Sequence, residues 1–98
     1  MRLYYENKYN QIGRELIGEF TTPEEVAECI LSFLEECQFE VYYFRIIDYR
    51  EKNDTLIIDF GSHYQFYYVE DCRHILSEFA NRMEDYRRQR GSQRGQVP

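Results

Sequence analysis

The chain has no tryptophan, two prolines and only two lysines, Lys8 and Lys52, among its 98 residues. Its five glycines form no phosphate-binding loop, because neither Gly13 nor Gly18 has the spacing and the Lys-Ser/Thr ending that such a loop needs. No stretch approaches the roughly 18 apolar residues of a membrane-spanning helix, and the N-terminus lacks the apolar segment of a secretory signal. These absences argue against a P-loop enzyme and a membrane protein, and we expect a cytoplasmic location.

Cysteine and histidine are too few and too scattered to predict a metal or catalytic centre. The three cysteines, Cys29, Cys37 and Cys72, form no Cys-x-x-Cys pair. Cys29 and Cys37 fall in one predicted helix, about 12 Å of rise apart, which is too far for a disulfide. Cys72 and His74 are two residues apart and would point in different directions from a helix. We therefore expect reduced thiols, no metal, no cofactor and no enzymatic activity.

The charges are separated along the chain, although the net charge is only −6. All 18 acidic residues lie at or before Asp85, together with 8 of the 12 basic residues, so this part carries 8 − 18 = −10. From Tyr86 onward there are four arginines and no acid. A body with this charge repels nucleic acid and anionic membranes, and it is compatible with a basic protein partner.

The N-terminal third predicts a β-hairpin followed by a helix. Two short strands, Arg2 to Tyr5 and Gly13 to Phe20, flank a polar turn. The helix is predicted from Pro23 to about Cys37, because Thr22 can cap its first amides and Glu25 completes a capping box. Its apolar residues recur at helical spacing: Val26, Ile30, Phe33, Leu34 and Cys37.

The remainder predicts three strands and a second helix. The strands are Phe39–Arg50, Thr55–Phe60 and His63–Val69, joined by a polar turn and by Gly61-Ser62. The second helix should begin near Asp71 and carry an apolar stripe to about Tyr86, with Arg87, Arg88 and Arg90 in its last turn. The prediction is a single α+β domain over residues 1–86, with element order ββαβββα. Residues 87–98 are expected to form a basic and largely disordered tail.

The predicted sheet has more aromatic side chains than one small core can bury, since aromatic residues make up 17% of the chain. With both helices on one face, alternation places one set toward the core: Tyr42, Phe44, Ile46, Leu56, Ile58, Phe60, Tyr64, Phe66 and Tyr68. The second face then carries Val41, Tyr43, Arg45, Ile47, Tyr49, Ile57, Asp59, His63, Gln65, Tyr67 and Val69. Tyrosine and arginine anchor many interfaces. We expect a protein-interaction or self-association module, most simply a homodimer, with Tyr43, Arg45, Tyr49 and Tyr67 in contact with the partner.

One alternative is nucleic-acid binding. In the order helix–strand–strand–strand–helix, though in nothing else, the chain resembles the double-stranded RNA-binding domain, which gathers lysines at the start of its second helix. The corresponding segment here, Glu70-Asp71-Cys72-Arg73-His74, has two acids and one arginine. Because phosphate attraction dominates nucleic-acid affinity, a nucleic-acid partner is the weaker expectation.

Another alternative uses the acidic outer side of the first helix. Its glutamates are Glu24, Glu25, Glu28, Glu35 and Glu36. A small protein with such a face could imitate a nucleic-acid backbone and inhibit a nucleic-acid enzyme, as phage and mobile-element inhibitors do. An amphipathic helix exposes a charged side in any case, so this pattern alone does not distinguish the two.

Overall fold

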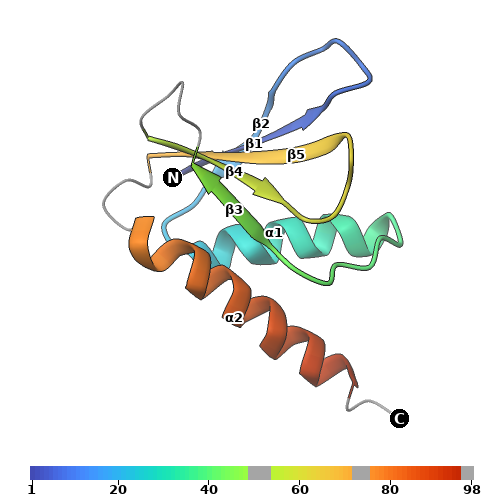
Figure 1. Cartoon of the computed structure of the whole chain (residues 1–98), viewed down its shortest axis with the longest axis vertical. Coiled ribbons are helices and arrows are strands. Elements are labelled where there is room, and N and C mark those ends of the chain that lie inside the picture. Colours follow the sequence, from blue (N-terminus) through green and yellow to red (C-terminus); the bar gives the residue numbers. More distant parts are fainter. Residues whose placement is uncertain (49–53, 72–75, 96–98) are drawn as a thin grey trace.

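Seven elements follow one another in the order ββαβββα (Figure 1). The fold is that of a computed structural model, which describes residues 1–48, 54–71 and 76–95. The strands are β1 (Arg2–Asn7), β2 (Glu15–Glu19), β3 (Arg45–Asp48), β4 (Thr55–Asp59) and β5 (Gln65–Glu70), and the helices are α1 (Pro23–Glu36) and α2 (Leu76–Gly95). The predicted α+β class and element order are confirmed.

The five strands form one antiparallel sheet in the order β2-β1-β5-β4-β3. The N-terminal hairpin extends the meander because β1 pairs with β5 along its whole length, from Arg2 opposite Glu70 to Asn7 opposite Gln65. β2 is an edge strand, and its register shifts opposite Leu3 and Tyr4. The hairpin therefore widens the sheet instead of folding over one of its faces.

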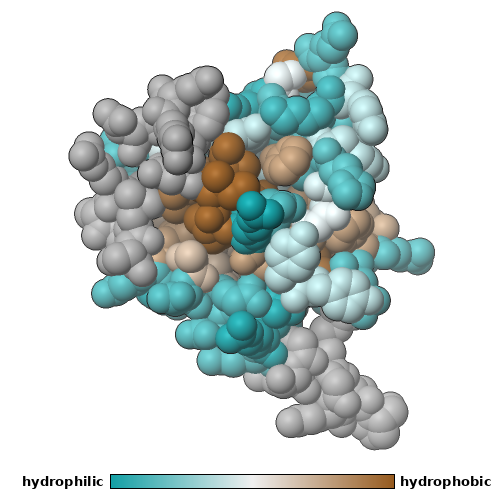
Figure 2. All heavy atoms as spheres, in the orientation of Figure 1, coloured by the Kyte–Doolittle hydropathy of each residue, from teal (hydrophilic) through white to brown (hydrophobic). Residues whose placement is uncertain are grey.

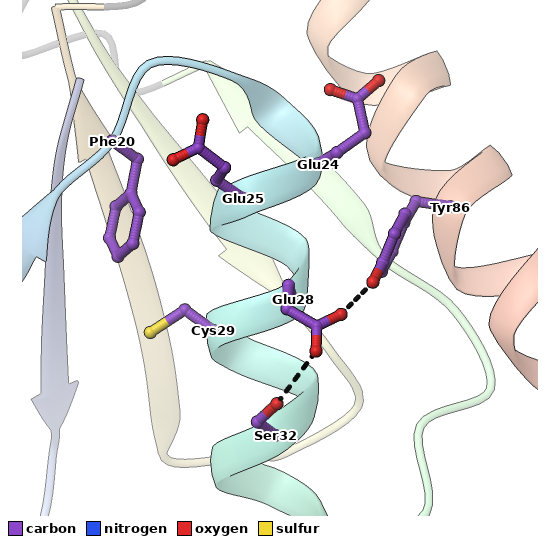
Figure 3. Close-up of a pocket in the computed structure, with 7 residues that line it drawn as sticks. All are labelled: Phe20, Glu24, Glu25, Glu28, Cys29, Ser32 and Tyr86. Atoms are coloured by element: carbon purple, nitrogen blue, oxygen red, sulfur yellow. Dashed lines mark hydrogen bonds between the residues drawn. The ribbon is translucent and has the colours of Figure 1, made fainter.

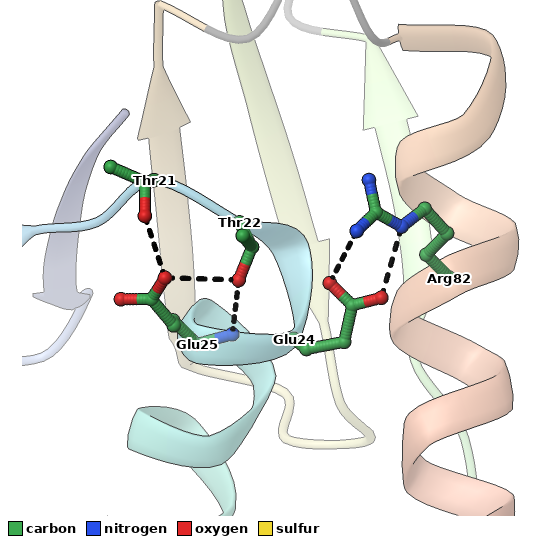
Figure 4. A network of polar contacts seen from close by, with 5 residues as sticks. All are labelled: Thr21, Thr22, Glu24, Glu25 and Arg82. Atoms are coloured by element: carbon green, nitrogen blue, oxygen red, sulfur yellow. Dashed lines mark hydrogen bonds and ion pairs between the residues drawn. The ribbon is translucent and has the colours of Figure 1, made fainter.

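Helix α1 begins where the capping pattern predicts. The Thr22 hydroxyl oxygen accepts a hydrogen bond from the amide of Glu25 at 3.2 Å, and Pro23 occupies the first turn (Figure 4). The Glu25 carboxylate in turn accepts hydrogen bonds from the hydroxyls of Thr21 and Thr22. The bond from Glu25 to Thr22 satisfies one of the amides that a helix start leaves unpaired, so the sequence determines this end locally.

Both helices cover the same face of the sheet, and the core lies between them and the strands (Figure 1). The buried residues come from α1, α2 and alternate positions of the strands: Val26, Ala27, Ile30, Leu31 and Leu34; Phe79 and Met83; and Leu3, Leu56, Ile58, Tyr67 and Val69. A bidentate contact joins the helices, since Arg82 donates from Nε and Nη2 to the two oxygens of Glu24 at 2.9 and 2.7 Å (Figure 4). One face of the sheet is therefore left without a helix.

The predicted alternation in β5 is wrong. Ile58 in the core pairs with Tyr67, so Tyr67 and Val69 face the helices, while Phe66 and Tyr68 face away. Directly opposite residues of an antiparallel pair share a face. An even number of residues, 59–66, separates Ile58 from Tyr67. The core face therefore holds even-numbered residues of β4 but odd-numbered residues of β5, whereas the prediction used even numbers on both strands.

The predicted strand Phe39–Arg50 is also too long at its start. Residues 39–44 are not a strand, because side chains of α2 bind their backbone. The Glu84 carboxylate accepts from the amide of Phe44 at 2.7 Å, and Arg87 donates to the carbonyl of Val41 at 3.5 Å. Only Arg45–Asp48 then pairs as β3, and Arg50 lies outside the described residues.

Helix α2 is described from Leu76 to Gly95, and the predicted start near Asp71 adjoins residues 72–75, which lie outside the described part of the chain. Arg87, Arg88 and Arg90 are helical, as their predicted place in the last turn requires. The helix then continues through residues 91–95, which the sequence assigned to a disordered tail. Residues 96–98 lie outside the described part of the chain, as do Cys72 and His74.

Candidate protein-interaction surface

The face of the sheet opposite the helices, the open face, carries one continuous row of apolar side chains. Cross-strand pairing runs from Ile47 on β3 to Ile57 on β4, then to Tyr68, Tyr4 and Leu16. This apolar row crosses all five strands, one residue from each. Because paired residues share a face, the five side chains form a band perpendicular to the strands.

The ends of the apolar row are exposed and its centre is buried. Leu16 is 56% exposed and Ile47 is 36% exposed, whereas Tyr4 and Ile57 are half-buried and Tyr68 is 2% exposed. In Figure 2 the strongest hydrophobic colour on the visible face lies over β3 and β4, the strands that contribute the isoleucine pair. Exposed apolar side chains mark many contact surfaces, and here Leu16 and Ile47 supply them at the two ends of the row.

Tyr68 at the centre is fixed by charged groups of the hairpin. The guanidinium of Arg14 lies 3.8 Å from the Tyr68 ring centroid, and the Tyr68 hydroxyl donates to Glu6 Oε1 at 2.7 Å. Lys8 reaches the same oxygen of Glu6 at 3.1 Å. The hydrogen bond from Tyr68 lowers the pKa of Glu6, and burial raises the pKa of Tyr68. This arrangement holds the middle of the face in one conformation.

Charged side chains flank the apolar row on both sides. Two positions along each strand in one direction lie Arg45, Asp59, Phe66 and Glu6; we call these four the Glu6 row. In the other direction lie Thr55, Glu70, Arg2 and Glu19, the Arg2 row, in which Thr55 and Glu70 are buried. An apolar centre with a charged rim is the usual anatomy of a protein interface.

The structure places the four predicted contact residues in different environments. Arg45 is exposed on β3 and points to the open face, while Tyr43 precedes the strand, is 44% exposed and lies near Gly61. Tyr49 is outside the described residues. Tyr67 is 2% exposed in the core, so its predicted position on the second face is wrong.

Sequence reasoning missed Tyr4, Leu16 and Tyr68 as members of this surface. Tyr4 and Leu16 belong to the hairpin, whose place beside β5 follows from pairing between residues far apart in the sequence. Tyr68 was assigned to the core because of the reversed alternation. The local signal available for Leu16 is an apolar residue between charges in a short strand, which identifies no particular face.

The acidic side of α1 is largely paired with α2. Besides the contact of Glu24 with Arg82, Arg90 bridges Glu28 at 3.2 Å and Glu35 at 2.8 Å. The hydroxyl of Tyr86 also donates to Glu28 (Figure 3). The arginines that the sequence assigned to a tail therefore compensate part of the negative charge of α1.

An open pocket of about 460 Å³ lies along the outer side of α1 (Figure 3). It is lined by Phe20, Glu24, Glu25, Glu28, Cys29, Ser32 and Tyr86. The three carboxylates are already bonded: Glu24 to Arg82, Glu25 to the hydroxyls of the cap, and Glu28 to Ser32, Tyr86 and Arg90. Burial raises the pKa of the Cys29 thiol, which keeps it protonated and a poor nucleophile.

Among residues 1–48, 54–71 and 76–95, no three His, Cys, Asp or Glu side chains lie together as metal ligands. No helix in the described part of the chain combines the length and hydropathy needed to cross a membrane. In comparisons with protein-family models, curated proteins and solved structures, nothing matches this chain.

Proposed function

We propose that this chain is a non-enzymatic protein-interaction module and that the open face of its sheet is the contact surface. The observation that carries the proposal is the apolar row. It presents Ile47 and Leu16 to solvent at opposite ends of one band, with charged residues along both sides. A partner that covers this band removes apolar surface from water, which is the main favourable term in protein association.

The β3 end of the row has the composition of an interface anchor. Arg45 is exposed and forms no ion pair with any described residue, and the exposed Tyr43 precedes it by two positions. Arginine and tyrosine offer large contact area together with hydrogen-bonding groups, and residues of these types carry much of the binding energy at interfaces. A carboxylate of the partner would complete the contacts of Arg45.

The alternative of an acidic nucleic-acid mimic has less support. Its surface would be the outer side of α1, where Arg82 and Arg90 already pair with three of the five glutamates. A basic groove on an enzyme would have to compete with these contacts. The open face needs no such rearrangement, because its apolar ends are already exposed.

Site-specific photo-crosslinking tests the proposal. A photoreactive amino acid placed at Ile47, on the open face, is expected to give a protein adduct in the cells that produce this chain. The matched control places the same amino acid at Ile12, which is 69% exposed in the loop between β1 and β2. Adducts at equal yield from both positions, or from neither, would refute the open face as the contact surface.

A further inference from the structure

We infer that the partner of the open face is a second copy of this chain, docked face to face about a two-fold axis that runs along the apolar row. This inference rests on the proposed function, because it names the occupant of the same surface. A rotation about this axis superposes the two apolar rows strand by strand: β3 on β3, β4 on β4 and β5 on β5. It also reverses the direction of the strands, as in many aligned sheet packings.

The two charged rows are complementary under this rotation. Each lies about 7 Å from the apolar row, because two residues along a strand span that distance. The rotation therefore brings the Glu6 row of one copy over the Arg2 row of the other. On β1, Glu6 meets Arg2 of the second copy. This contact joins opposite charges, and the symmetry produces it twice.

The other two-fold arrangement of the same face joins like charges. An axis parallel to the strands would place β1 against β4 and β2 against β3, with each charged row over its own equivalent. Glu6 would then meet Asp59 of the second copy. Like charges in direct contact across an interface oppose association, so this charge pattern selects the axis along the row.

The central pair has atoms available for this contact. The contacts that Glu6 makes within its own chain use Oε1, for both the Tyr68 hydroxyl and Lys8. The ion pairs of Arg2 with Glu70 and Asp71 use Nη2, at 3.2 and 3.0 Å. A partner that binds Oε2 of Glu6 or Nη1 of Arg2 would leave these bonds in place.

Position in the sheet makes the Glu6–Arg2 contact the one to test. Packed sheets are rotated by about 30° relative to each other, so opposing residues lose alignment toward the outer strands. Glu6 and Arg2 lie on the strand next to β5, about 8–9 Å from the centre of the row, so this rotation misaligns them by about 4 Å, within reach of an arginine.

A mixing experiment distinguishes this dimer from other associations. Glu6→Lys and Arg2→Glu each place like charges in both central contacts, and each is expected to raise the dimer dissociation constant at least about tenfold. In a 1:1 mixture, one copy carries two acids and the other two bases at these positions. Both contacts then join opposite charges, so the mixture is expected to regain the wild-type mass in light scattering. Glu36→Lys, an exposed charge reversal on α1, is the control and should leave the mass unchanged.

The outcomes separate this inference from the proposed function. A wild-type chain that stays monomeric over a concentration series, or single variants that dimerise as well as wild type, overturns the two-fold dimer. A heterologous adduct at Ile47 in the crosslinking experiment would then still support the open face as a contact surface. If Arg2→Glu does not fold by circular dichroism, Tyr4→Lys replaces it: a monomer supports the dimer, provided that Ile12→Lys keeps the wild-type mass, and an unchanged dimer refutes it.

Discussion

Removing the hydroxyl of Tyr67 is expected to make this protein more stable. Tyr67 is 2% exposed, and its ring packs between Tyr5 and Phe60, with centroid distances of 5.4 and 5.5 Å. Its hydroxyl is buried and has no hydrogen-bond partner among the described residues. Burial raises the pKa of this hydroxyl, which agrees with an apolar environment. Tyr67→Phe keeps the ring contacts and removes the unpaired polar group.

The magnitude follows from the cost of burying an unpaired hydroxyl. Such a group destabilises a fold by roughly 1–3 kcal/mol in mutational data. We expect Tyr67→Phe to raise the free energy of unfolding by about 1 kcal/mol, the lower end of this range, because relaxation of the surrounding side chains recovers part of the cost. In a domain of this size, that gain corresponds to a rise of about 4–8 °C in Tm.

The neighbouring residue is the matched control. Tyr68 is also 2% exposed, but it lies on the opposite face and its hydroxyl donates to the carboxylate of Glu6 at 2.7 Å. Hydrogen bonds to charged groups contribute about 1.5–3 kcal/mol, so Tyr68→Phe is expected to lower the free energy of unfolding by about 2 kcal/mol. The same chemical change at adjacent positions should therefore act in opposite directions.

Urea denaturation followed by circular dichroism measures both effects. If the slope of the unfolding free energy against urea concentration is unchanged, the compactness of the folded and unfolded states is preserved. If both variants lose stability to the same extent, the Tyr67 hydroxyl has a partner in solution and the reasoning is wrong. If Tyr67→Phe is neutral and alters only association, the placement of Tyr67 in the core is refuted.

Two further changes test the contacts that position the helices. Thr22→Ala removes the cap of α1 and is expected to cost about 1 kcal/mol of stability, measured by urea denaturation, with Thr21→Ala as the less affected control. For Glu84, burial opposes ionisation, but the hydrogen bonds from Arg87 and from the amide of Phe44 outweigh it and lower the pKa. Ionised Glu84 therefore contributes stability above the ordinary pKa of a glutamate, and this contribution is lost as the pH falls through the folded-state value. Glu84→Gln should lower stability by roughly 1 kcal/mol at pH 7 and make its decline toward pH 3 shallower; parallel wild-type and variant curves from pH 7 to 3 would contradict this.

The elements that the sequence predicted well are those determined by neighbouring residues. Thr22, Pro23 and Glu25 determine the start of α1 through contacts within four residues of the chain. The spacing of Val26, Ile30 and Leu34 places the buried side of that helix correctly. These signals are local, and they do not depend on what packs against the helix.

The elements that it predicted poorly depend on distant partners. Residues 39–44 have the apolar content of a strand, but Glu84 and Arg87 bind two of their backbone groups from α2. The arginines at the end of the chain resemble a solvated tail until α1 supplies Glu28 and Glu35 as partners. In both cases the deciding contacts join residues 40 or more positions apart, beyond the reach of local patterns.

The sequence predicted the wrong facing for the side chains of β5 but still placed a tyrosine on the open face, because aromatic residues occupy both faces of this strand. The run Phe66-Tyr67-Tyr68 has a large side chain at every position, so the sequence of β5 alone does not show which side chains face the helices. Whichever set faces the helices, one tyrosine lies on the open face. The facing is set by pairing: Ile58 opposite Tyr67 on one side of β5, and Leu3 opposite Val69 on the other. This pairing exchanges which tyrosine packs against the helices and which one lies on the open face. It also adds Tyr4 beside Tyr68, since β1 must follow the same alternation once Leu3 is in the core. The open face thus follows from the placement of the core, and a substitution that moved Tyr67 out of the core would change both faces at once.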